Sequence, residues 1–242
     1  MSELFSIQLQ NRQQQGRDGV WLDLPTTTEQ VQAALRQIGI SSDNPQSLFI
    51  SGYFAEEEKR FAIPYNMVLA SSVDELNFLA ARLETLSAGE RTELNAALQA
   101  PQSELSSIGR IIDFPENVDY YVHLPEVHGP AQLGDYYLNR SGMVDMPEEW
   151  KGGIDTAQFG RYVAQQEQGA FTQYGYLVKS GDEWQKVHEG QPVPEEYRVL
   201  SFPAPEVLRD AVNIPSPVQP ETEPQKVIPI ILNGTDSAER MK

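Results

Sequence analysis

The sequence predicts an α+β protein with a small antiparallel sheet unit, a helical middle unit, an acidic α+β carboxy-terminal unit and a disordered tail. Three observations support this fold class. Apolar residues alternate near the amino terminus, recur at helical spacing from about residue 72, and give way to a proline-rich composition after residue 202. Alternation places side chains on one face of a strand, whereas a spacing of three and four places them on one face of a helix.

The first unit is predicted from two kinds of local signal. Phe5, Ile7 and Leu9 alternate with polar residues, as in a half-buried strand, and residues 20–24 and 48–54 are expected to form two further strands. Thr27 and Gln30 have the spacing of a capping box, which marks the start of a helix. We therefore expect a small sheet plus helix domain over residues 1–70.

The second unit is predicted from helix start signals. Ser72 with Glu75, and Ser87 with Glu90, repeat the capping-box spacing, and each pair precedes an apolar stripe of period 3.6. A third helix is expected around residues 105–112. Helices this short are marginal alone in water, so they must bury their stripes against each other or a sheet. This predicts a helical domain over residues 71–114.

The third unit combines both patterns. We expect a strand at 118–123, a helix at 133–139, a helix that starts at Pro147, and a further helix capped by Asp155 or Thr156. Residues 169–179 are expected to form one closing strand. The acidic α+β domain would therefore cover residues 115–202. Seven prolines in residues 203–242 predict a proline-rich disordered tail.

Charge is the main indication of function. The chain has a formal net charge of -17, and the segment after residue 202 contains six acids and four bases, so -15 belongs to the part expected to fold. Such a field attracts basic partners and repels nucleic acid and anionic membranes. The densest segment, residues 113–155, has nine acids and two bases. We expect its acids to form a partner-binding surface: Asp113, Glu116, Asp119, Glu126, Asp135, Asp145, Glu148, Glu149 and Asp155.

The sequence contains no convincing catalytic or metal centre. Cysteine is absent, and the segment His123-Leu-Pro-Glu126-Val-His128 has neither the order nor the continuous helix that a zinc protease site requires. Hydrolase, phosphate-binding and dinucleotide-binding motifs are missing. We therefore expect a non-enzyme without cofactor or metal. No apolar run reaches the ~18 residues of a membrane helix, which favours a cytoplasmic protein.

Three segments resemble the ArdA antirestriction family: LGDYYLNRSGMVDMPEEW with Tyr136 and Tyr137, IDTAQFGRYV, and GAFTQYGYL. Asp155, Phe159, Gly160 and Arg161 match an acidic motif of this family, and the segment around Trp21 is also similar to it. The resemblance covers the chain from the first strand to about residue 178. It does not extend to the segment from residue 179 onward.

The resemblance implies an elongated, curved protein that forms a homodimer through its carboxy-terminal part. It also implies a B-DNA mimic, encoded by mobile DNA, that occupies the DNA-binding cleft of the methyltransferase core of type I restriction-modification enzymes in the bacterial cytoplasm. Two alternatives stay open. A general acidic interaction module would bind many basic proteins, and a hydrolase would lose its activity on substitution of one carboxylate or of His123.

Overall fold

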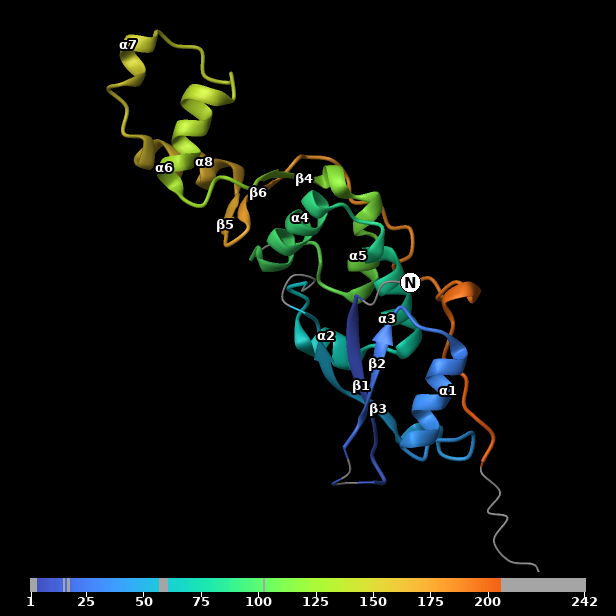
Figure 1. The fold of residues 1–242 in the computed structure, drawn as a ribbon. Coiled ribbons are helices and arrows are strands. Elements are labelled where there is room, and N and C mark those ends of the chain that lie inside the picture. Colours follow the sequence, from blue (N-terminus) through green and yellow to red (C-terminus); the bar gives the residue numbers. More distant parts are fainter. Residues whose placement is uncertain (1–3, 15, 17, 57–60, 102, 206–242) are drawn as a thin grey trace, which may run out of the picture. The chain divides into compact units, whose positions relative to one another are not determined.

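The computed structural model describes residues 4–14, 16, 18–56, 61–101 and 103–205 (Figure 1). Within these ranges the protein is a mixed α+β fold with two small antiparallel sheets, which confirms the predicted class. Nearly all of the predicted tail lies outside the described residues. Residues up to Pro205 group into one compact unit. The boundaries expected near residues 70 and 114 stay predictions.

The first sheet has the strand order β2-β1-β3, with both neighbouring pairs antiparallel. Its strands are β1 (Phe5–Asn11), β2 (Val20–Leu24) and β3 (Leu48–Phe54), as the alternation predicts. Helix α1 (Thr28–Gln37) begins with the expected capping box and buries Val31, Ala34 and Leu35. A short 3-10 turn, η1 (Pro45–Ser47), leads into β3.

The helical part contains one element that the sequence patterns did not predict. Helix α2 (Tyr65–Ala70) follows Pro64, has no side-chain cap, and buries only Val68, so it lacks both signals used above. Helices α3 (Val73–Glu84) and α4 (Ala88–Gln99) start with the predicted capping boxes, and α5 (Ile108–Ile112) is the expected third helix. Their apolar stripes join the first sheet in one buried cluster.

The acidic part has a second sheet of order β4-β6-β5. A 3-10 turn, η3 (Phe114–Glu116), precedes the predicted strand at 118–123. The first residues of that strand form a second 3-10 turn, η4 (Val118–Tyr120), and β4 (Tyr121–Leu124) follows. Helix α6 (Pro130–Asp135) continues into the π-helix η5 (Tyr136–Arg140), and α7 (Glu148–Lys151) and α8 (Thr156–Glu167) follow. Val127, Leu133, Ala164 and Tyr176 form a smaller core of their own.

The expected single closing strand at 169–179 is wrong, because this segment is a hairpin. Strand β5 (Ala170–Thr172) turns back into β6 (Gly175–Lys179), with Phe171 opposite Tyr176. The Thr172 hydroxyl accepts from the Tyr174 N–H and donates to the Gly175 carbonyl, and Gly175 takes a φ of 118°. Residues with a side chain rarely adopt that φ, so this position of the turn favours glycine.

After β6 the chain runs back over the helical part to the first sheet unit, with one 3-10 turn, η6 (Glu195–Tyr197) (Figure 1). Among the described residues, no helix is both long and apolar enough to cross a membrane.

Candidate functional site

The structure corrects one member of the predicted acidic surface. Asp113 is fully buried, and its carboxylate accepts backbone N–H bonds from Val187, His188 and Glu189 at 3.2, 2.7 and 3.1 Å. A buried carboxylate is stable only when such donors replace its water. Asp113 therefore has a structural role and cannot meet a partner at the surface.

Four of the remaining eight acids already have partners within the chain. Glu116 pairs with Arg82, and Asp135 pairs with Arg140 at 2.9 Å. Glu148 pairs with Lys151, but its side chain stays 81% exposed. Asp155 caps α8 by accepting the N–H groups of residues 157 and 158. These acids are partly or fully exposed, yet their charge is partly compensated or used locally.

The other four acids are exposed and form neither an ion pair nor a hydrogen bond within the described residues: Asp119, Glu126, Asp145 and Glu149. Exposed Met143, at 75%, and Trp150, at 68%, lie in the same segment as Asp145 and Glu149. Asp119 lies in η4 and Glu149 in α7, whereas Glu126 lies in a turn and Asp145 in a segment without regular secondary structure. Within the predicted surface, these four carboxylates are the ones left to meet basic groups of a partner.

Two glycines position the helices that carry this surface. A Cβ on Gly160 of α8 would lie 1.8 Å from the Pro130 carbonyl oxygen, and one on Gly134 of α6 would lie 1.9 Å from that of Thr156. Each glycine thus lets the backbone of one helix contact the other. Within the motif of Phe159, Gly160 and Arg161, Gly160 allows the close contact between α6 and α8, and Arg161 is exposed.

A carboxylate outside the predicted acidic segment connects α8 to the second sheet. Glu167 accepts a hydrogen bond from the Tyr137 hydroxyl at 2.5 Å and one from the Tyr176 hydroxyl at 3.0 Å. Burial, followed by the nearby Glu167, raises the pKa of both phenols, so they remain protonated donors. The motif tyrosine Tyr137 is therefore part of the support of α8.

Two more of the predicted motif aromatics, Tyr136 and Trp21, have separate surroundings. The Arg140 guanidinium lies over the Tyr136 ring in a cation–π geometry, with Arg140 Cζ 6.0 Å from the ring centroid. Trp21 is 49% exposed on β2, with its ring edge-on to Phe54 at 6.4 Å. Among the described residues, Trp21 forms no ring contact, ion pair or hydrogen bond with the acidic segment 113–155.

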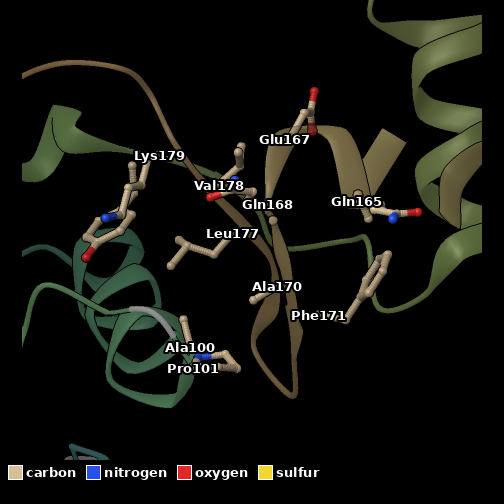
Figure 2. A pocket seen from close by; sticks show the side chains of 13 residues that line it. Ala100, Pro101, Gln165, Glu167, Gln168, Ala170, Phe171, Leu177, Val178 and Lys179 are labelled. Atoms are coloured by element: carbon tan, nitrogen blue, oxygen red, sulfur yellow. The ribbon is translucent and has the colours of Figure 1, made fainter. Parts of the chain in front are cut away.

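A cavity of about 510 Å³ lies between the end of α4 and the second sheet (Figure 2). Ala100 and Pro101 line it on one side, and Ala170 and Leu177 line it on the other. Its charged lining groups are already engaged, because Glu167 binds the two tyrosines and Lys179 pairs with Glu104 at 2.7 Å. The cavity therefore offers no free acid and base for catalysis.

One group of side chains has the composition of a metal site. Single ligand atoms of Asp113, Glu116 and His188 lie within 4.8 Å of one another. Asp113 already accepts three N–H bonds, and Glu116 pairs with Arg82, whose positive charge opposes a cation. In the predicted histidine segment, His123 Nε2 lies 2.8 Å from the Tyr174 carbonyl. Both arrangements are explained as structural contacts.

The fold and this surface define an acidic α+β protein that presents exposed carboxylates. The sequence profile of the antirestriction protein family ArdA matches residues 15–178. The chain belongs to the ArdA antirestriction protein family, which confirms the resemblance seen in the sequence. No curated protein matches the chain in a sequence search.

Proposed function

We propose that this antirestriction protein is a B-DNA mimic that occupies the DNA-binding cleft of the methyltransferase core of type I restriction-modification enzymes. In this proposal it acts without catalysis or cofactor, as a homodimer in the cytoplasm of a bacterial host that receives mobile DNA. Family membership supports the antirestriction role. The net charge of -17 supports electrostatic competition for a basic cleft.

The physical basis is the field of duplex DNA. B-DNA carries about one negative charge per 1.7 Å of its axis, and this field contributes much of its affinity for proteins. Carboxylates on a folded backbone can meet the same lysines and arginines. They also avoid the ordering cost that a flexible acidic segment would incur on binding.

The observation that carries the proposal is the group of exposed acids without internal partners. Asp119, Glu126, Asp145 and Glu149 keep their charge available although arginines and lysines pair with their neighbours. We propose that these four, with Glu116, Asp135, Glu148 and Asp155, form the partner-binding surface. Asp113 is not included, because it is buried.

Two variants with equal charge changes test the location of this surface. The first neutralises the segment with Asp145→Asn, Glu148→Gln, Glu149→Gln and Asp155→Asn; asparagine at residue 155 keeps a capping oxygen for α8. The second neutralises four exposed acids elsewhere: Asp18, Asp43, Glu195 and Glu196. Both variants change the net charge by four.

We expect the first variant to lose inhibition and the second to keep most of it. Ion pairs at an exposed interface contribute roughly 0.2–1 kcal/mol each, so four lost pairs predict weakening of about 4-fold to about 800-fold. Any single change should cost less than about fivefold. The assay is titration of a purified type I enzyme with each variant, with DNA cleavage as the readout.

The outcomes separate the two functional classes. Equal weakening by both variants would indicate that only total charge matters, as for a general acidic module that binds basic proteins. Full inhibition by the first variant would refute the mimic. Inhibition should also decrease as salt increases, because screening weakens exposed charge pairs. Sedimentation of the free protein tests the homodimer.

A further inference from the structure

The segment that follows the residues matched by the family profile packs against the rest of the fold. We name residues 180–205 the strap; it follows β6 and lies beyond the matched residues 15–178. Apart from η6 it has no regular secondary structure, so its backbone groups need partners elsewhere. Four side chains of the matched part supply such partners: Asp74, Asn77, Asp113 and Asn117.

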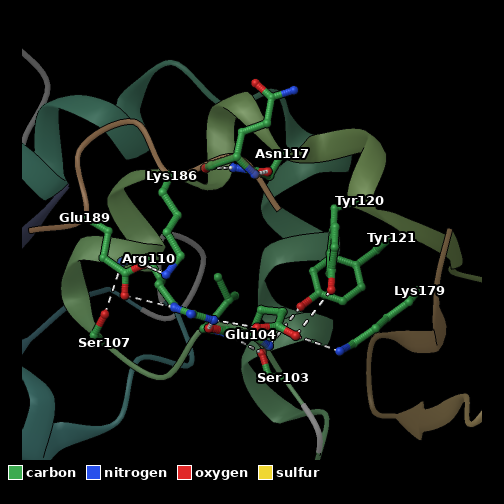
Figure 3. Close-up of polar contacts among 12 residues, drawn as sticks. Ser103, Glu104, Ser107, Arg110, Asn117, Tyr120, Tyr121, Lys179, Lys186 and Glu189 are labelled. Atoms are coloured by element: carbon green, nitrogen blue, oxygen red, sulfur yellow. Dashed lines mark hydrogen bonds and ion pairs between the residues drawn. The ribbon is translucent and has the colours of Figure 1, made fainter. Parts of the chain in front are cut away.

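The first anchor holds the part of the strap next to α5. Asn117 accepts the Gln185 N–H at 2.7 Å and donates to the Gln185 carbonyl at 3.0 Å, so it binds this residue as a neighbouring strand would. Asp113 then binds three successive N–H groups. Glu189 adds an ion pair with Arg110 at 3.0 Å (Figure 3).

The second anchor holds the strap against α3. One oxygen of Asp74 accepts the N–H groups of Val199 and Leu200 at 2.8 and 2.7 Å. Asn77 is buried and donates to the Tyr197 carbonyl at 3.1 Å, while its oxygen accepts the Thr26 N–H at 2.7 Å.

The strap also contacts the first sheet unit. The Ser42 N–H donates to the Pro203 carbonyl at 2.9 Å, and the Gln32 side chain donates to Ser201 at 3.2 Å. Val199 belongs to the main buried cluster. The strap therefore joins α5, α3 and the α1 region through polar contacts and a shared core.

We propose that the strap is a positioning element for the part of the carboxylate surface that contains Glu116 and Asp119, because the adjacent Asp113 and Asn117 bind it, and that Asp113 and Asp74 act as its anchors rather than as mimics of phosphate. This inference rests on the proposed function. A surface that competes with DNA needs a fixed spacing of charges, because ordering on binding lowers affinity. Surface acids would meet the partner, whereas the anchor acids act only through the strap.

A pair of variants with identical charge tests the anchors. Asp74→Asn keeps an oxygen that can accept both N–H groups, since Asp74 uses one oxygen for both bonds. Asp113 uses both oxygens, so Asp113→Asn places an amide NH₂ against backbone N–H groups. Each variant removes one negative charge. We measure amide hydrogen exchange of the strap and inhibition of a type I enzyme for both.

We expect Asp113→Asn to lose protection at the amides of residues 187–189 by at least tenfold and to inhibit at least tenfold less well. Asp74→Asn should keep both properties within about threefold. The slope of inhibition against salt should stay the same in both, because the surface acids remain. Equal behaviour of the two variants, or lost protection with full inhibition, would overturn the inference.

A second experiment covers the case in which Asp113→Asn does not fold. A specific protease site inserted between Gly190 and Gln191 of the full chain places a cut in an exposed turn between the two anchors. The uncut insertion protein is the control, and cleavage leaves every carboxylate in place. Cleavage should weaken inhibition at least tenfold; unchanged inhibition refutes the inference. If the intact protein fails to inhibit although its strap amides are protected, the proposed function itself is refuted.

Discussion

Glu93 on α4 gives a prediction whose sign and size follow from its surroundings. Its Oε1 atom is buried and has no hydrogen-bond partner among the residues that the structure describes. Burial, followed by the charges of Glu90 and Asp119, raises the pKa of Glu93 to about 7 from an ordinary value of 4.5. The folded protein therefore disfavours the carboxylate form of this side chain.

The raised pKa sets the pH range of the effect. Below pH 4.5 the group is protonated in both the folded and unfolded states, and the fold is not penalised. As pH rises from 4.5 to 7, the unfolded chain ionises first, and the stability contributed by the neutral acid is lost. At 1.36 kcal/mol per pH unit the full cost is about 3 kcal/mol, and partial solvent contact reduces it to about 2 kcal/mol.

Glu93→Gln should therefore stabilise the protein above pH 7 and have little effect at pH 4.5. A gain of about 2 kcal/mol raises the midpoint of thermal unfolding by about 4–8 °C for a chain of this size. The assay is thermal or urea unfolding of wild type and variant from pH 4.5 to 8.5. A stability difference that does not change with pH would refute the reasoning.

Glu90→Gln on the same helix is the matched control, because its pKa moves in the opposite direction. Its capping contacts with Ser87 lower the pKa of Glu90, so its carboxylate contributes stability that is lost as pH falls. This variant should be destabilised at pH 8 rather than stabilised. The opposite signs exclude a general effect of removing charge from α4.

Two further predictions concern the helices of the acidic part. Gly160→Ala should destabilise the protein by about 2 kcal/mol or more in urea unfolding, because the added Cβ would overlap the Pro130 carbonyl. Gly152→Ala is the control. The space around Gly152 is open, so this change should alter stability by less than about 0.5 kcal/mol. Glu167→Gln should reduce the free energy of unfolding by about 1–3 kcal/mol, because an amide keeps only one oxygen for the two tyrosine donors. The double variant with Tyr137→Phe should lose less stability than the sum of the two single changes. Additive costs in that double-mutant cycle would contradict the proposed contact.

The sequence predicts helices whose first turn is stabilised by residues close together in the chain. The three capping boxes at Thr27, Ser72 and Ser87 are present, because a hydroxyl and a carboxylate or amide three residues later interact within one turn. Helix α2 was missed because it has no such cap. The β5–β6 hairpin has no Asn-Gly or similar pair in its turn, so the local sequence does not distinguish it from a single strand.

The roles of the acids were less predictable, because identical residue types act in different surroundings. Asp113 and Asp145 are the same residue type in the same acidic segment, yet Asp113 is buried against the strap and Asp145 is exposed. The contacts of Asp113 join residues about 75 positions apart, and those of Asp74 join residues about 125 positions apart. No periodicity in one segment could indicate such pairs. The other eight acids of residues 113–155 are at least partly exposed, because charge usually remains at the surface, and their role in partner binding stays a prediction.

The return of the strap to the first unit also sets an order of events during synthesis. Ser42 and Pro203 bond to each other although 161 positions separate them. At about 5–20 residues per second a ribosome needs roughly 8–32 s to make the intervening chain. For that interval α1 and α3 are present without the strap, so Gln32 of α1 lacks its partner Ser201, and Asp74 of α3 lacks the N–H groups of residues 199 and 200. Completion of this fold is therefore a late step that depends on residues outside the family match.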